Sequence, residues 1–291
     1  MNLTWAYVGV LYALAVWLLR RAHVELPRRV ALLFFALALA FLWRPLTSEV
    51  TLIPADVIRL TPPFSEMRAP GRAPVDKYQV SNLNLHDIPM QLIPWTERVR
   101  DAWRSFEVPL WDDSAGCGYP LLANGQSTPL SPLRLVTLPL SLNHAMTAEA
   151  AMRLLIALVL TFLFCRTRYS KFASVVAAIA YAFSTWMTVW LQFPIASAAA
   201  FLPGVLLCIE TLLEEGTRAR FIAAALLFAT TVLSGHPETV FHIGLIAAAF
   251  GFWVALVERR AFKPLLRVAG ASVVAALIAS PFLVPFAEAV M

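Results

Sequence analysis

Charged residues are scarce in this 291-residue chain. They make up 14% of the sequence, whereas about 25% is typical of soluble domains, and hydrophobic residues make up 59% with a mean hydropathy of +0.70. This composition excludes an ordinary soluble globular domain. It predicts an integral membrane protein whose helices contact the lipid bilayer.

Cysteine is also rare, with three residues in the whole chain. Cys165 and Cys208 fall in apolar runs, and only Cys117 falls in a polar stretch. No disulfide framework is therefore available in an oxidising compartment. An extracytoplasmic segment of this protein has to be held by its own packing and by the membrane.

Lys and Arg are absent from two short turns, 191–197 and 234–238, although the net charge is +5 and the pI is about 9.4. Of the 23 Lys and Arg, 13 occupy four other connections: Arg20, Arg21, Arg28 and Arg29; Arg166, Arg168 and Lys171; Arg218 and Arg220; Arg259, Arg260, Lys263 and Arg267. Such alternation is typical of cytoplasmic loops in the bacterial inner membrane. It accounts for the basic charge without a nucleic-acid partner, and it places the amino terminus and both turns on the extracytoplasmic side.

Apolar runs with few or no charges predict about eight membrane spans, since crossing a bilayer takes roughly 20 apolar residues. The runs cover 1–19, 30–43, 148–165, 172–209 (long enough for two spans, turning near Gln192), 221–233, 239–257 and 268–287. The run at 30–43 is short, so Arg28, Arg29 and Arg44 would have to snorkel. Glu149 and Arg153 would pair one turn apart at the start of the third span. The last run reaches Met291 without a following polar segment, so we expect the front part of a longer protein.

The predicted fold is therefore an all-α polytopic bundle with three regions. Residues 1–45 form two transmembrane helices, 46–147 form a large extracytoplasmic loop subdomain, and 148–291 form six further transmembrane helices. A mere connector needs only a few residues, yet the loop is long and rich in Gly, Pro, Asn and carboxylates. We expect it to fold and to carry the chemistry.

An amphipathic helix is predicted near 94–106 within the loop. Pro94 can start it, and Trp95, Val99, Trp103 and Phe106 recur at helical spacing. It could lie flat in the lipid headgroup zone or be a packed surface helix. Arg98, Arg100 and Arg104 would then lie near lipid phosphates.

Several polar residues of the loop have both a chemical and a structural interpretation. Asp87 can act as a general base or bind a divalent cation, or it can be a turn or cap residue. Asp112 and Asp113 can share a metal or form an ordinary turn. Gly118 and Gly125 can let the backbone approach a ligand or only shape tight turns.

A second set of ionisable groups lies in the turn at 234–238, on the same predicted side as the loop. His236 and Glu238 are unnecessary for a simple chain reversal and are candidates for a site, although both could simply face water. His242, one turn further, is expected to hydrogen-bond a neighbouring helix.

These motifs resemble those of a known family. Three strings in this chain resemble the first outer loop of bacterial YfhO-like membrane proteins: Asp87…Gln91…Pro94, Pro109-Leu110-Trp111, and Gly116-x-Gly118-Tyr119-Pro120-Leu121-Leu122-Ala123-Asn124-x-Gln126-Ser127. A fourth, Gly235-His236-Pro237-Glu238, is similar to a turn in the same family. The resemblance covers about two thirds of the chain. This chain has Leu-Trp-Asp112-Asp113 where the family usually has Leu-Trp-Asn-Pro, and family members are normally much longer.

The resemblance implies the fold of the GT-C glycosyltransferases, which take sugars from polyprenyl-phosphate carriers. It implies that Asp87 is the essential acidic residue, acting as base toward an acceptor hydroxyl of a cell-wall polymer or glycolipid, or as a metal-linked organiser. The expected substrate-binding residues are His86, Gln91, Arg98, Arg104, Asn124, Gln126, His236 and Glu238. Arg98, Arg104 or Lys77 would neutralise the leaving phosphate, so a divalent cation, with Asp87, Asp112 and Asp113 as candidate ligands, is compatible but not required.

The competing class is a non-enzymatic transporter or a cell-envelope assembly scaffold. A transporter should place its ionisable residues near the bilayer midplane. The candidates here, Asp87, Asp112, Asp113, His236 and Glu238, all fall at one predicted surface. The sequence therefore favours the enzyme.

Overall fold

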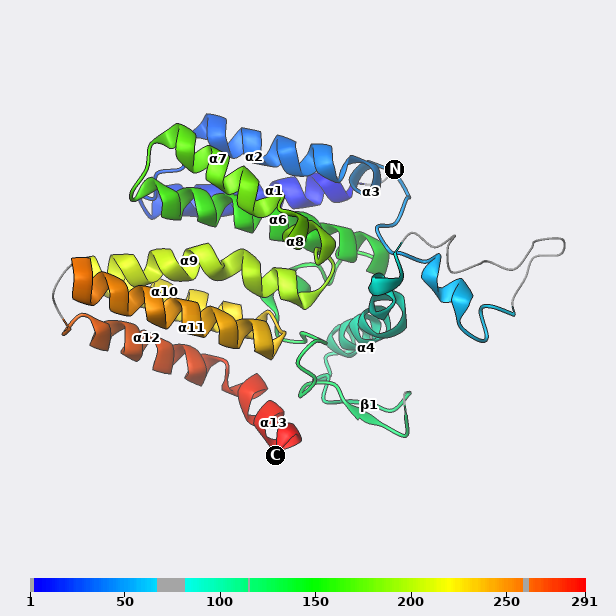
Figure 1. Cartoon of the computed structure of the whole chain (residues 1–291). Helices are drawn as coiled ribbons and strands as arrows, with labels where there is room; N and C mark the ends of the chain where they lie inside the picture. The colour runs from blue at the N-terminus through cyan, green and yellow to red at the C-terminus, as the bar shows by residue number, and fades with distance from the viewer. Residues whose placement is uncertain (1–2, 67–81, 115, 259–261) are drawn as a thin grey trace.

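The computed structural model describes residues 3–66, 82–114, 116–258 and 262–291, and Lys77 lies outside these ranges. Its regular secondary structure is almost entirely helical, with two short strands among the described residues (Figure 1). Its longer helices are α1 (Thr4–Arg21), α2 (Arg28–Phe41), α4 (Ile93–Arg104), α6 (Leu142–Arg166), α7 (Lys171–Ala182), α9 (Pro194–Glu214), α10 (Arg218–Leu233), α11 (Pro237–Trp253), α12 (Leu265–Ile278) and α13 (Ser280–Val290). The short elements are α3 (Trp43–Thr47), η1 (Val57–Leu60), η3 (Leu83–Leu85), η4 (Ile88–Leu92), β1 (Trp111–Asp112), β2 (Tyr119–Pro120), α5 (Pro132–Val136), α8 (Thr185–Val189) and η5 (Val254–Glu258).

Two groups of helices lie side by side along the long axis of the molecule (Figure 1). In the first group, α1, α2 and α7 pack on α6, with Phe34 of α2 edge-on to Phe162 of α6 at a centroid distance of 5.8 Å. In the second, α10, α11 and α12 pack on α9. Contacts between α6 and α9 join the groups, so these two helices form the buried centre.

Three of the described helices are long and apolar enough to cross a membrane: α6, α9, and α11 continued by η5. A fourth span results if α12 and α13, which meet at a bend of 77°, count as one. The predicted eight spans are therefore not confirmed. The helices α2, α7 and α10 have 14, 12 and 16 residues. They are about 18–24 Å long, which is shorter than the roughly 30 Å of hydrocarbon in a bilayer. The helix α1 is longer, but its last two residues are arginines.

The predicted span at 268–287 is interrupted. The helix α12 ends at Ile278, and α13 begins at Ser280 with Pro281 in its first turn. Proline has no backbone N–H to continue the hydrogen bonds of the preceding helix, so the break falls where the sequence has Ser-Pro. The bend turns α13 away from the axis of α12, as Figure 1 shows.

The Arg-bearing connections after α1, α6 and α9 lie at one end of the helices, and the described parts of the segment from α3 to α5 lie at the other (Figure 1). The turns before α9 and α11 are at the same end as that segment. A hydrogen bond from the side chain of Gln192 to the carbonyl of Leu52, 2.9 Å long, ties the first of these turns to it. The chain thus brings the loop and both turns together, while the side of the membrane they face stays a prediction.

The predicted helix at 94–106 exists as α4 but ends earlier, and one residue of its predicted apolar face is displaced. Val99 is fully buried, but Phe106 adopts a left-handed backbone conformation (φ 59°) beyond the helix and is 97% exposed. Trp103 donates its indole N–H to the carbonyl of Pro129 at 2.9 Å. The helix is therefore packed against the rest of the loop, as in the second of the two interpretations.

Candidate functional site

The two sequence motifs that carry the family resemblance contact each other directly. The backbone N–H of His236 donates to the carbonyl of Gly125 at 2.6 Å. A Cβ on Gly125 would lie 2.6 Å from Cδ of Pro237, and one on Gly235 would lie 2.4 Å from Cγ2 of Thr128. Since real Cβ atoms do not approach so closely, both glycines are required by this docking.

The loop side of the contact is a buried turn. Asn124 accepts from the backbone N–H of Gln126 at 2.8 Å, and the hydroxyl of Ser127 donates to the carbonyls of Leu121 at 2.6 Å and Asn124 at 3.1 Å. The amide nitrogen Nδ2 of Asn124 is buried and has no partner among the described residues. Asn124 and Gln126, both predicted to bind substrate, thus first of all shape the turn that presents Gly125.

His236 caps the helix that follows it. Its φ of 57° is left-handed, and its Nδ1 accepts from the backbone N–H of Thr239 at 3.3 Å and lies 2.8 Å from the Thr239 hydroxyl. The neutral ring therefore carries its proton on Nε2. Partial burial lowers the pKa of His236 below its usual 6.5, with His242 reinforcing this shift and Glu238 opposing it. Glu238 itself is exposed in the first turn of α11.

Asp87 lies at the start of η4, a turn of π-helix, and is exposed. Among the described residues its carboxylate has no hydrogen bond or ion pair. The next residue, Ile88, is buried in a cluster with Phe193, and Pro194 lies 3.3 Å from the position of a Cβ on Gly235. Asp87 is thereby anchored, through its neighbour and the turn before α9, to the same end of the bundle as the His236 turn.

His86 and Gln91, the other two predicted site residues of this segment, flank Asp87 in the sequence. His86 is half-buried and Gln91 is exposed. Within the part of the chain that the structure describes, neither side chain has a hydrogen-bond partner. Both remain available to a ligand near Asp87.

Arg98 is engaged by two carboxylates rather than free for a phosphate. Its guanidinium lies 3.3 Å from Asp112 and 3.4 Å from Asp113. Asp112, which is 3% exposed, also accepts from the N–H of Ser114 at 3.0 Å and from its hydroxyl at 2.6 Å. Burial would raise the pKa of Asp112, but these hydrogen bonds and the charge of Arg98 outweigh it and hold the pKa below its usual range.

Arg104 and Arg100 also have structural partners. Arg104 donates to the carbonyls of Leu138 at 2.8 Å and Leu140 at 2.6 Å. Arg100, predicted to lie near lipid phosphates, is instead 1% exposed and donates to the carbonyl of Thr137 at 3.1 Å and to that of Leu140. The two guanidinium groups thus hold the connection between α5 and α6 against α4.

A buried charge cluster lies beneath this connection. Glu149 of α6 is 2% exposed and lies 3.0 Å from Nε of Arg134 and 3.1 Å from Nη2 of Arg153. Arg153 also donates to the hydroxyl of Ser197 at 2.6 Å and to the carbonyl of Leu191 at 2.7 Å. The helical pairing of Glu149 with Arg153 was predicted and is confirmed, whereas no periodicity could reveal Arg134, which comes from the loop.

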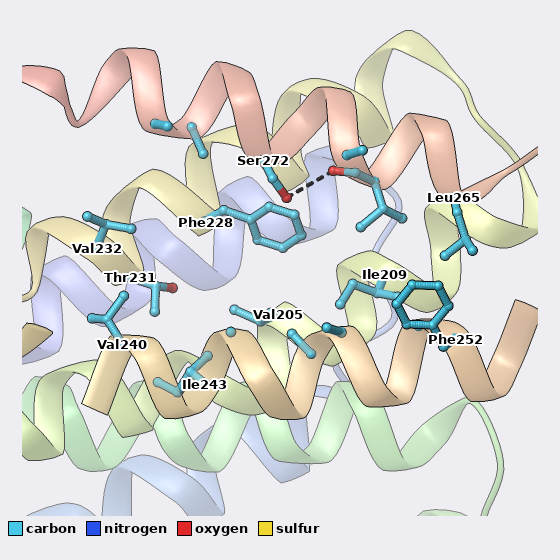
Figure 2. Close-up of a pocket in the computed structure, with 18 of the residues that line it drawn as sticks. Val205, Ile209, Phe228, Thr231, Val232, Val240, Ile243, Phe252, Leu265 and Ser272 are labelled. Atoms are coloured by element: carbon cyan, nitrogen blue, oxygen red, sulfur yellow. Dashed lines mark hydrogen bonds between the residues drawn. The ribbon is translucent and has the colours of Figure 1, made fainter. Parts of the chain in front are cut away.

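An apolar groove of about 690 Å³ opens between α9, α10, α11 and α12. Figure 2 shows Phe228 near its middle, Val232 and Val240 toward one end, and Leu265 and Phe252 toward the other. No motif of the sequence predicted this groove. The only sequence signal is the small residues Gly244, Ala247, Ala248 and Gly251, which share one face of α11 and all line it.

One end of the groove reaches the docked loop. Val240 follows His236 by one helical turn, and Leu283 of α13 also lines the groove. Phe286, one turn after Leu283, would lie 3.5 Å from a Cβ on Gly125. The apolar groove and the Gly125–His236 contact are therefore adjacent.

A divalent-cation centre finds little support in the described residues. They contain no group of three or more His, Cys, Asp or Glu side chains placed to hold a metal. Asp112, a candidate ligand, is committed to Arg98 and Ser114. Asp87 offers a single carboxylate.

The fold and this site define the class: a helical membrane protein with a loop docked over one end of its helices. Residues 79–291 match the family described as bacterial membrane protein YfhO, so the chain belongs to this family. No curated protein and no solved structure gives a match.

Proposed function

We propose that this protein is a membrane glycosyltransferase that moves a sugar from a polyprenyl-phosphate carrier to a hydroxyl of an extracytoplasmic polymer or glycolipid. The observation that carries the proposal is the junction of an apolar groove with a polar, ionisable surface at one end of the bundle. A lipid-linked sugar has the same two parts, a long hydrocarbon chain and a polar head. The protein then belongs to the inner membrane, with the loop facing outward.

The reaction requires a base beside the acceptor and an environment that tolerates the departing phosphate. Asp87 is the proposed base, because its carboxylate is exposed and unpartnered among the described residues. It accepts the proton of the acceptor hydroxyl while that oxygen attacks the sugar carbon and the bond to the carrier phosphate breaks. His236 could donate a hydrogen bond through Nε2, since its Nδ1 is occupied by Thr239.

The leaving phosphate needs a cation beside it, and three side chains and a metal ion are candidates. Arg98 and Arg104 are held by Asp112 and by backbone carbonyls, so each would have to exchange a protein partner for phosphate. Lys77 remains a candidate from the sequence. A divalent cation would have to be held by Asp87 with oxygen atoms of the substrate.

A matched pair of substitutions tests this proposal. In membranes containing the complete protein and radiolabelled polyprenyl-phosphate sugars, Asp87→Asn should lower transfer about 10²- to 10⁴-fold, the range for loss of a general base, at unchanged protein level. Asp112→Asn should retain most transfer and instead lower thermal stability, because its carboxylate is buried against Arg98 and Ser114. Transfer that survives in Asp87→Asn but is lost in Asp112→Asn would identify the other carboxylate as the base. If membranes containing the complete protein transfer no more sugar than membranes that lack it, the transporter or scaffold class becomes the better explanation.

A further inference from the structure

A second cavity, of about 510 Å³, lies between α4 and the segment that follows it. The left-handed conformation of Phe106 reverses the chain after α4, and the N–H of Glu107 donates back to the carbonyl of Ala102 at 2.9 Å. The chain then runs back along the helix toward β1. Leu121, 1% exposed, also lines the cavity.

One residue of the lining carries an aromatic ring that is supported by the neighbouring chain and yet largely exposed. Trp111 lines the cavity and is 60% exposed. Gly118 has a φ of 108°, and a Cβ there would lie 2.5 Å from Nε1 of Trp111. The absence of a side chain at Gly118 lets the indole lie against this residue while the rest of the ring stays accessible.

The rest of the lining combines apolar residues, Ala102, Val108, Pro109, Leu110 and Leu121, with two kinds of polar groups. Arg98 and Asp112 are fixed by their ion pair and by Ser114. Asp101, Ser105 and Glu107 also line the cavity, and their side chains have no hydrogen-bond partner among the described residues. The fixed groups define the shape, and the free ones can donate and accept hydrogen bonds with a ligand.

The charge of the lining restricts the ligand. Asp101, Glu107, Asp112 and Asp113 contribute four carboxylates, and Arg98 contributes the one guanidinium of the lining. An excess of carboxylates repels a phosphate group, since like charges at short range disfavour each other. The cavity therefore suits a neutral or amine-bearing molecule that is rich in hydroxyl groups and has one apolar face.

We propose that this cavity binds a single sugar unit, with the apolar face of the ring on Trp111 and its hydroxyls on Asp101, Ser105 and Glu107. An aromatic ring combined with convergent polar groups recognises such a ligand. This inference rests on the proposed function, because the sugar would be supplied by either the acceptor or the lipid-linked donor. It places the phosphate outside this cavity, which leaves Arg104 and Lys77 rather than Arg98 as its candidate partners.

The test measures protection of Trp111 in the full chain in nanodiscs. N-bromosuccinimide oxidation, quantified by peptide mass spectrometry, reports Trp111 and, as an internal control, Trp186 of α8, which is 48% exposed. The probes are methyl glycosides of glucose, N-acetylglucosamine and glucosamine, the same sugars on decaprenyl phosphate, and a glycerol-phosphate oligomer. We expect at least one sugar to slow oxidation of Trp111 several-fold and to leave Trp186 unchanged.

A pair of variants locates the binding. Asp101→Asn should raise the sugar concentration needed for protection about tenfold, as expected for losing one hydrogen bond to a charged group. Glu97→Gln, an exposed change on the same helix that does not line the cavity, should leave that concentration unchanged. Equal behaviour of the two variants would refute the assigned contacts.

The remaining outcomes each decide the proposal. Protection by free glycosides indicates the acceptor as the source, and protection by the lipid-linked forms alone indicates the donor. The proposal is overturned if no sugar in either form protects Trp111, or if the glycerol-phosphate oligomer protects it at least as well. Protection without any transfer activity would keep the sugar site and reject the proposed function.

Discussion

Removing the charge of Glu149 should destabilise the protein more than removing any exposed carboxylate. In Glu149→Gln the size of the side chain is kept, but Arg134 and Arg153, 4% and 3% exposed, lose their shared counter-charge. The hydroxyl of Thr137, 3.3 Å from Oε1 of Glu149, also loses a charged acceptor.

The loss in the free energy of unfolding depends on the two buried guanidinium groups that remain after the carboxylate is removed. Breaking a buried ion pair by removing one partner costs about 3–5 kcal/mol, because the other charge is left uncompensated, and here two charges are left. Arg153 keeps its hydrogen bonds to Ser197 and Leu191, which limits its share. Arg134 is only 3.0 Å from Glu149 but is not aligned for a hydrogen bond, and its Nη1 has no partner among the described residues, so its cost is mainly electrostatic.

Thermal unfolding of the purified protein in nanodiscs measures this effect. At about 2 °C per kcal/mol for a chain of this size, we expect the midpoint of Glu149→Gln to fall by at least about 6 °C. The control is Glu214→Gln, whose carboxylate is 56% exposed and 3.9 Å from Arg220, and exposed pairs of this kind contribute about 0–1 kcal/mol. Equal midpoints for the two variants would show that the buried cluster is hydrated or differently paired, and the reasoning would be wrong.

Three further predictions concern the turn before α11 and its docking. The pKa of His236 is lowered in the folded protein, so the unfolded chain binds a proton at this residue more strongly. The stability that His236 contributes is therefore present above pH 6.5 and is lost as the pH falls below it. His236→Asn can cap the helix and adopt the same backbone conformation, so this variant should flatten the pH dependence of the unfolding midpoint. Gly235→Ala should cost about 1–3 kcal/mol in the same measurement, because φ is 87° there and the new Cβ would lie 2.4 Å from Cγ2 of Thr128. The control Gly244→Ala adds a Cβ in open space on α11 and should be neutral or slightly stabilising. A similar loss of stability in both variants would mean that the docking is not tight. Topology reporters fused at Gly125 and at Gly235 should both report the periplasm, and a cytoplasmic signal from either would contradict the shared site.

The membrane class, the helical fold and the grouping of motifs could be predicted from the sequence, because they depend on local composition. A run of apolar residues needs no partner to favour a helix in lipid, and the turn near Gln192 appears where Pro194 begins α9. The family motifs were likewise visible as ordered strings of Gly, Pro and Asn. The number of spans was less predictable, since helices of 12 to 16 residues and the bend before Pro281 depend on neighbouring helices and the loop.

Tertiary structure alone decided which polar residues are free to act. Arg98 and Arg104 are equivalent to other loop arginines in the sequence, yet Asp112 and the carbonyl of Leu138 occupy them, whereas Asp87 stays unpartnered among the described residues. The sequence likewise does not show that Gly125 touches His236 or that a groove ends beside them. Those features arise from contacts between residues far apart in the chain, and such contacts depend on how whole helices pack rather than on the chemistry of any short segment.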